Sequence, residues 1–345
     1  MEINIDIKEN DIFQQSPELL ETLLIDHSKS HTPKGQPEKP KQNIIWATND
    51  YVEQYGDRYE FHQQILPELI TGDRGDVIRP RAAKARDEQR FRSREMAEVF
   101  TPSWVCNAQN NLVDEAWFGR KDVFNREIND GATHTWEVVT DKITFPEGKT
   151  WKDYVRSTRL EITCGEAPYL ASRYDTTTGE FIPVERRIGM LDRKLRVVSE
   201  NTETSGAWLE WAQIAYKNTL GFEWQGDNLL IARETLLYTF VDFYIAKFDK
   251  MPLKKSINYI AYIVSWNLFQ MDGLKGVIPD TCKNGVTEVE QTLFGDTEVM
   301  VYCEGCKTEN NYINHNGIYA LVKDWGAKDP NTKEDKVLRF IDLIK

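Results

Sequence analysis

Three cysteines and one histidine towards the C-terminal end of the sequence have the residue types and spacing of a metal site. Cys282, Cys303, Cys306 and His315 follow the pattern C-x20-C-x2-C-x8-H. The Cys-Glu-Gly-Cys turn lets two thiolates face one ion, and Cys3His is a common ligand set of structural zinc. We therefore predict a structural zinc ion held by these four side chains. A redox-active CxxC pair and surface cysteines without a partner are the alternatives.

A second candidate for chemistry is the loop that follows a short apolar run at 159–163. Cys164-Gly165 is expected to make the sharp turn at the end of this strand. In open α/β sheets, ligands bind just beyond the carboxyl ends of the strands. A glycine there lets the backbone approach the ligand closely. The loop therefore predicts a nucleoside cofactor site, and a solvated acid at the strand end is the alternative role for Glu161.

A third candidate is Glu223, which ends a predicted strand and precedes a predicted helix starting near Asn228. An acid in this position commonly binds ribose hydroxyls in such folds. It could instead be an acid favoured by the positive end of the helix dipole. Phe100 and Trp224 are aromatic residues that could contact a ligand or simply belong to the core.

Together these segments resemble the adenine-N6 DNA methyltransferases of restriction-modification systems. Glu98-Val-Phe-Thr-Pro102 is similar to the EFFTP-like segment of that family. Glu161 to Leu170 is similar to its DPACGTGxFL-like loop, and Gly221 and Glu223 match the start of its GxExDxxAxxxAxxN-like segment. The resemblance covers roughly residues 90 to 240.

The resemblance implies S-adenosylmethionine as the cofactor and a Rossmann-like α/β methyltransferase sheet. It also assigns roles to individual residues. The methionine end of the cofactor would lie against Phe100, Thr101 and Pro102. Its amino-acid moiety would lie against Glu161, Cys164, Gly165 and Glu166. Its ribose and adenine would lie against Glu223 and Trp224.

The catalytic tetrapeptide of the family, Asn/Asp-Pro-Pro-Tyr/Phe, is absent. None of the 13 prolines stands beside another proline. In the family, this loop accepts the amine protons of a flipped adenine and stacks on the base. The catalytic residues are therefore unknown, and the chain is expected to hold the cofactor half of a methyltransferase or to be an inactive relative.

A basic segment at 74–94 stands out in a chain of net charge −12. It holds seven arginines and one lysine against three acids, a balance of +5 (8 − 3). It could be a solvated helix with internal ion pairs, or an edge that contacts DNA phosphates. The predicted phosphate-contacting residues are Arg79, Arg81, Lys84, Arg86, Arg90, Arg92 and Arg94.

Composition and spacing suggest how the chain is organised. The sequence has 345 residues and five cysteines, no run of 18 apolar residues and no apolar signal core at its start. We expect a soluble cytoplasmic protein without a membrane partner. Helical periodicity predicts helices near 17–24, 208–220, 228–248 and 256–271. The expected parts are a flexible segment (1–43), a helical region (44–155), a cofactor-binding core (156–275), a zinc-binding insertion (276–325) and a C-terminal helix (326–345).

Three functional interpretations follow from the sequence. The first is a DNA adenine-N6 methyltransferase, or its cofactor-binding half, working on double-stranded DNA with a second methyltransferase, specificity or restriction subunit. The second is a catalytically inactive, methyltransferase-like subunit for DNA binding or assembly. The third is an unrelated zinc-stapled bacterial or phage protein, which would lack a sheet joining residues 159–163 and 219–223.

Overall fold

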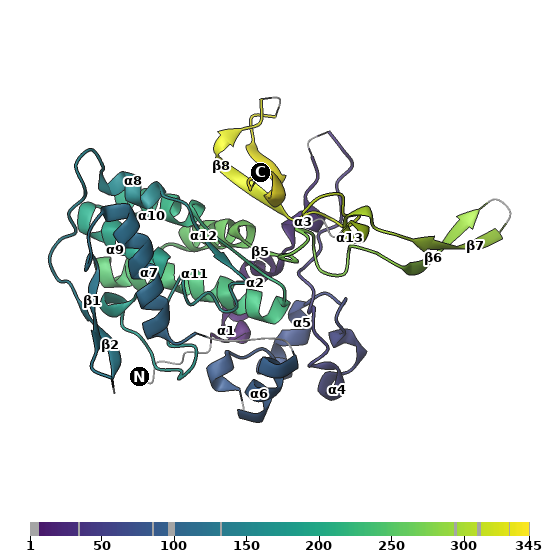
Figure 1. Ribbon diagram of the computed structural model, residues 1–345, viewed down its shortest axis with the longest axis horizontal. Coiled ribbons are helices and arrows are strands. Elements are labelled where there is room, and N and C mark those ends of the chain that lie inside the picture. Colours follow the sequence, from purple (N-terminus) through teal and green to yellow (C-terminus); the bar gives the residue numbers. More distant parts are fainter. Residues whose placement is uncertain are drawn as a thin grey trace. The chain divides into compact units, whose positions relative to one another are not determined.

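The computed structural model describes residues 7–33, 35–84, 86–95, 101–131, 133–292, 295–308, 312–330 and 332–344 (Figure 1). The fold is mixed α/β, with many helices and small sheets. The chain divides into two compact units, each made of segments that are distant in sequence. Unit 1 comprises Met1–Leu23, Pro67–Gly221 and Asp227–Leu268, and unit 2 comprises Leu24–Leu66, Phe222–Gly226 and Phe269–Lys345.

Unit 1 is mainly helical. Its longer helices, teal to green in Figure 1, are α7 (Ser103–Phe118), α9 (Met190–Asn201), α10 (Ser205–Lys217), α11 (Gly226–Phe248) and α12 (Lys254–Asn267). Its shorter helices are α1 (Glu9–Gln15), α2 (Pro17–Leu24), α5 (Pro67–Ile70), η2 (Gly72–Arg74), η3 (Arg81–Ala83), α6 (Arg86–Glu95), α8 (Trp151–Arg156) and η4 (Val184–Arg186). A hairpin of β1 (Asn125–Asn129) and β2 (His134–Val138) pairs in antiparallel register. The helices predicted at 17–24, 208–220, 228–248 and 256–271 are confirmed, with shifted ends.

A small parallel sheet contains the strands predicted around the cofactor loop. It has three strands in the order β3 (Arg159–Ile162), β4 (Thr219–Glu223) and β5 (Leu268–Gln270). The division between the two units falls within β4 and at the start of β5. β3 and β4 are thus neighbours in one sheet, as the third interpretation does not expect. The sheet has three strands, and the Rossmann-like methyltransferase sheet expected from the resemblance stays a prediction.

A buried polar stripe fixes helix α7 within unit 1. Asn107, Asn110, Asn111 and Asp114 recur every three or four residues and therefore share one face of the helix. Arg193 Nη1 donates to Asp114 Oδ2 at 2.6 Å, and its Nη2 donates to the side-chain oxygens of Asn107 and Asn111 at 2.9 and 2.8 Å. Buried charges are tolerated when they are paired and hydrogen-bonded in this way. The network sets the position of the helix whose first residues lie next to the loop after β3.

Unit 2 contains short elements around buried apolar residues. Its elements are α3 (His27–Ser30), α4 (Val52–Tyr55), η1 (Asp57–Tyr59), β6 (Val286–Thr292), β7 (Gly295–Val301), α13 (Glu304–Lys307), β8 (Leu321–Lys328), β9 (Asp335–Arg339) and η5 (Phe340–Asp342). One of its buried apolar clusters consists of Phe222, Phe269, Met271, Ile278, Ala320, Val322 and Phe340. Ile44, Trp46 and Ile65 of its N-terminal segment are buried as well. The side chain of Gln270 accepts from Ile45 N–H and donates to Ile45 C=O, both at 2.9 Å. These two hydrogen bonds join the first and last segments of the unit.

Three expectations about the organisation of the chain differ from the structure. Residues 326–345 do not form the predicted helix, because β8 and β9 pair there as an antiparallel hairpin. The run Asp335-Lys-Val-Leu-Arg339 has too few apolar residues for a helical stripe, and it pairs with β8 instead. The segment 1–43, expected to be flexible, contains α1, α2 and α3, and Leu20 and Leu23 are fully buried. Residues 44–69 form short helices and turns instead of a longer helical region.

None of the helices in the described ranges combines the length and apolar character needed to cross a bilayer.

Candidate metal centre

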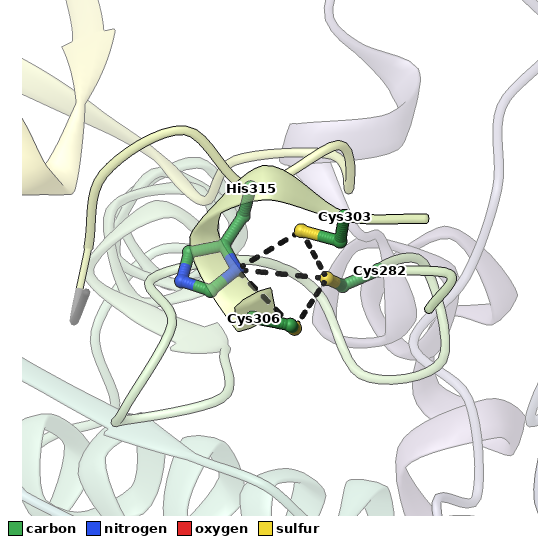
Figure 2. A group of neighbouring side chains, drawn as sticks. All are labelled: Cys282, Cys303, Cys306 and His315. Atoms are coloured by element: carbon green, nitrogen blue, oxygen red, sulfur yellow. Dashed lines mark hydrogen bonds between the residues drawn. The ribbon is translucent and has the colours of Figure 1, made fainter. Parts of the chain in front are cut away.

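Three separate loops of unit 2 bring the predicted metal ligands together. Cys282 lies just before the β6–β7 hairpin, and Cys303 follows it as the residue preceding α13. Cys306 lies within α13, and His315 lies on the loop leading to β8. Figure 2 shows the three sulfurs and the Nδ1 atom of His315 directed towards one another. All four potential ligand atoms lie within 4.8 Å of one another, so the group could hold a metal ion.

The distances within the group match a tetrahedral site. The Sγ atom of Cys282 lies 3.4 Å from that of Cys303 and 3.6 Å from that of Cys306. His315 Nδ1 lies 3.6, 3.4 and 3.7 Å from the sulfurs of Cys282, Cys303 and Cys306. Metal–ligand bonds of about 2.3 Å to sulfur and 2.0–2.1 Å to nitrogen predict edges of about 3.8 Å (S to S) and 3.6 Å (S to N). The five measured edges therefore leave a central space of the right size for one tetrahedral ion.

The cysteines of the group are free thiols and not disulfides. A sulfur–sulfur separation of 3.4 Å is far longer than the bond length of about 2.05 Å in a disulfide. Cys303 is fully buried and His315 is almost so, while Cys282 and Cys306 are half-buried. Because two thiols and an imidazole meet a third thiol in a partly enclosed space, a redox-active pair alone does not explain the arrangement.

The backbone around Cys303 favours its thiolate. Burial by itself would raise the pKa of Cys303. Hydrogen bonds from the backbone N–H groups of Cys306 and Asn316, and from the side chains of Cys282 and His315, outweigh burial and lower this pKa to about 6. Burial and the neighbouring thiols raise the pKa of Cys282 to about 12. The group thus stabilises negative charge on the sulfur at its buried end, which suits a cationic ligand.

Hydrogen bonds outside the group fix the loops that carry the ligands. Lys283 N–H donates to Asn316 Oδ1 at 2.9 Å, and Asn316 Nδ2 donates to Lys283 C=O at 2.8 Å. This pair links the loop of Cys282 to the loop of His315. The backbone N–H of His315 donates to the hydroxyl of Tyr319 at 2.9 Å. The positions of the ligands are therefore set by the surrounding protein as well as by contacts within the group.

Gly305 allows helix α13 and the loop that carries His315 to approach each other. A Cβ atom at this position would lie 2.5 Å from Ile313 C=O and 2.7 Å from His315 Nδ1. Such contacts require the backbone or the ligand to move. The glycine between Glu304 and Cys306 is thus needed for close packing of α13 against the histidine loop. The sequence analysis did not identify this role of Gly305. The glycine between the two cysteines of Cys-Glu-Gly-Cys could have indicated it.

The carboxylates of the loop predicted to bind a cofactor accept hydrogen bonds from other residues of unit 1. Glu161 accepts hydrogen bonds from the backbone N–H groups of Tyr169 and Leu170 at 3.4 and 3.2 Å. Glu166 is buried and accepts from Arg81 N–H and from the Tyr174 hydroxyl, both at 2.6 Å. These contacts stabilise the turn itself.

The turn after β3 has the tight geometry expected of it. Thr163, Gly165 and Ala167 all have positive φ angles, at 49°, 53° and 62°. Cys164 is buried, and its side chain packs against Gly221 of β4, where an added Cβ would lie 3.3 Å from the sulfur. Cys164 is therefore a packing residue at the junction of β3 and β4.

The structure also brings the described end of the FTP segment next to the loop after β3 within unit 1. Tyr169 on the loop packs against Cys106 of α7, and its hydroxyl is hydrogen-bonded to the side chain of Thr101. Thr101 and Pro102 therefore lie beside the loop after β3, with Pro102 preceding the first turn of α7. Phe100 lies outside the described residues.

Glu223 and Trp224 belong to unit 2 and contact its N-terminal segment. Glu223 is buried and accepts from the backbone N–H of Gln225 at 3.3 Å. The indole N–H of Trp224 donates to Ala47 C=O at 3.2 Å, and its ring lies 6.1 Å from that of Phe61. The aromatic packing role considered for Trp224 therefore has direct support from its contacts.

Two cations of the basic segment are buried within unit 1. Lys84 and Arg92 are buried and lie 3.8 and 2.8 Å from the carboxylate of Asp227. Their burial removes them from any surface that DNA could reach. Arg90 and Arg94 are exposed.

The remaining predicted phosphate contacts are divided between internal and surface positions. Arg79 lies 3.5 Å from Glu88 in a half-exposed pair, and Arg81 donates to Ser93 Oγ at 3.1 Å. The side chain of Arg86 lies outside the described part of the chain. Ion pairing within the segment, one of the two interpretations, is seen for Arg79, while Arg92 pairs with Asp227 outside the segment.

Comparisons with known proteins give no relative: no family model, no curated protein and no solved structure matches this chain.

Proposed function

We propose that Cys282, Cys303, Cys306 and His315 bind one structural Zn²⁺ ion, and that the protein acts by binding other molecules, not as a metalloenzyme. The observation that carries the proposal is the set of five ligand-to-ligand distances between 3.4 and 3.7 Å. Thiolate and imidazole ligands in a tetrahedral arrangement select zinc over harder cations.

The four protein side chains support a structural role for the ion. A catalytic zinc keeps one position open for water or substrate, whereas four protein ligands complete the tetrahedron. The bound ion would join the loop before β6, the helix α13 and the loop before β8. A cross-link between these three segments would stabilise the part of unit 2 that surrounds the ion.

Substitution of Gly305 by alanine tests the zinc proposal. We expect the purified native chain to contain one equivalent of zinc, and Gly305→Ala to weaken zinc affinity by roughly 10–100-fold, because the new methyl group displaces His315. Gly206→Ala is the matched control, since a Cβ there meets no atom within 4 Å. The measurement is competition with a chromophoric chelator. Two results would contradict the proposal. One is a folded native protein that does not bind zinc, and the other is equal zinc affinity in Gly305→Ala and Gly206→Ala.

We further propose that the chain is a methyltransferase-like subunit for DNA binding or assembly. The neighbouring strands β3 and β4, the tight turn after β3 and the position of Thr101 beside that turn support the likeness. The internal hydrogen bonds of Glu161 and Glu166 favour a binding subunit over an enzyme, because these carboxylates already have protein partners. The absence of the proline-rich catalytic tetrapeptide points in the same direction.

The second candidate function is an S-adenosylmethionine-dependent DNA adenine-N6 methyltransferase, or its cofactor-binding half. Its support is the order of the motif segments and the placement of Glu223 at the end of β4. In this case the catalytic loop would come from a partner subunit.

Calorimetric titration with S-adenosylmethionine distinguishes the two candidates. We expect no heat from the native chain, because the loop carboxylates are bound internally. Binding of duplex DNA that falls when Arg90 and Arg94 are changed to glutamate would then support the subunit role. Micromolar cofactor binding that is lost in Glu223→Ala and kept in the surface control Glu210→Ala would instead select the enzyme.

A further inference from the structure

The β6–β7 hairpin is an uncovered arm of unit 2. Its strands pair in antiparallel register over seven residue pairs, from Val286 with Val301 to Thr292 with Gly295. Among the residues that the structure describes, the sheet contains these two strands and no other. Figure 1 shows the hairpin extending away from α13. Residues 295–300 are all exposed, so no described part of the chain covers this strand.

The arm exposes apolar side chains, and no other described strand pairs with the outer edge of either β6 or β7. Val289, Val299 and Met300 have exposed fractions of 61%, 36% and 49%. An isolated two-stranded hairpin is only marginally stable in water, and its edges can pair with a further strand. The proposed zinc site provides the missing support at the open end, since Cys282 precedes β6 and Cys303 follows β7. The metal would therefore hold the arm in a conformation suitable for binding.

The charge of the arm indicates what it binds. Residues 286–301 contain four acids (Glu288, Glu290, Asp296 and Glu298) and no lysine or arginine. This charge repels the phosphate backbone of nucleic acid and the identical arm of a second copy. It attracts a basic segment, which an uncovered strand edge can accept as an additional strand.

We propose that the hairpin 286–301 is a docking arm for an extended, lysine- or arginine-rich segment of another protein. The segment adds as a third strand, placing its apolar side chains against those of the arm and its cations near the carboxylates. The proposal rests on the proposed zinc site only for the rigidity of the arm. Zinc content is measured separately, so that failure of one idea is distinguished from failure of the other.

The test uses the full zinc-loaded chain and two labelled twelve-residue peptides, one alternating lysine with valine and one alternating glutamate with valine. We expect fluorescence anisotropy to show binding of the lysine peptide only. The charge-reversal variant Asp296→Lys/Glu298→Lys should weaken this binding at least tenfold, and Val299→Ser/Met300→Ser should weaken it at constant charge. The control Glu185→Lys/Glu210→Lys changes two exposed acids of unit 1 by the same total charge.

Each result decides the question. Equal weakening by the hairpin and control variants would show a response to net charge alone and would overturn the proposal. Failure of the zinc-loaded native chain to bind the lysine peptide would overturn it as well. Self-association or duplex DNA binding that depends on residues 296–300 would assign the arm to a second copy or to nucleic acid instead. Absence of zinc from the native chain would reject the metal site and leave the peptide result to be judged by itself.

Discussion

Cys303→Ser is expected to reduce the zinc content from one equivalent to nearly none and to unfold the part of unit 2 around the metal. Cys303 is fully buried, and its sulfur lies 3.4 Å from both Cys282 Sγ and His315 Nδ1. Serine cannot supply a thiolate, and its hydroxyl would leave the other ligands without their buried partner. Structural zinc contributes apparent binding energies on the order of 10 kcal/mol or more in small zinc domains. Such a loss is comparable to the whole free energy of unfolding of most domains.

The control for this prediction is Cys106→Ser, which changes another buried cysteine that lies in unit 1 and outside the metal group. This variant should keep one equivalent of zinc. Hydrogen exchange of residues 278–320, measured with and without a chelator, reports directly on the metal-bound segment. If Cys303→Ser retains both zinc and native exchange protection, the group is not a structural metal site.

Asp227→Ala is expected to destabilise unit 1 by about 3–5 kcal/mol, because removing one partner of a buried ion pair leaves uncompensated charge. The carboxylate is fully buried and lies 2.8 Å from Arg92 and 3.8 Å from Lys84, which are themselves buried. Both cations would lose their counter-ion. Urea denaturation monitored by tryptophan fluorescence measures the change in free energy of unfolding.

A surface pair provides the comparison for Asp227. Glu115 and Lys121 lie 4.0 Å apart with exposed side chains, and Glu115→Ala should cost no more than about 1 kcal/mol. Arg92→Ala should behave like Asp227→Ala, while changes at the exposed Arg90 and Arg94 should leave stability nearly unchanged. An Asp227→Ala variant as stable as Glu115→Ala would show that the buried carboxylate is not needed to balance the two cations.

The metal group was predictable because its chemistry depends on a few residues at short spacing. The two cysteines of the Cys-Glu-Gly-Cys turn must point the same way, and Cys282 and His315 were the remaining candidates nearby. The strands around the cofactor loop were equally visible as apolar runs ending in glycine or acid. Local sequence was sufficient for both features.

Other features depended on contacts distant in sequence. Nothing near Lys84 and Arg92 indicates that Asp227, more than 130 residues further along the chain, would bury them together. Glu166 likewise meets Arg81, which is 85 residues away. The C-terminal hairpin was mistaken for a helix, although the run 335–339 has too few apolar residues for a helical stripe and pairs with β8, most of which lies in a different part of the predicted division of the chain. In each case, the structure of the segment depends on contacts with residues that are distant in sequence.

The division of unit 2 into three separate stretches of chain has a consequence for its biosynthesis. Residues 24–66 leave the ribosome early, but Ile45 obtains its hydrogen bonds from Gln270. The metal group is complete only when His315 has been translated. The contacts of this segment with residues 269–345 can therefore form only after the intervening residues have been made, a period in which nascent chains are prone to aggregate. Zinc uptake at the proposed site would thus come late in maturation, and zinc-starved cells should accumulate chains that depend on chaperones.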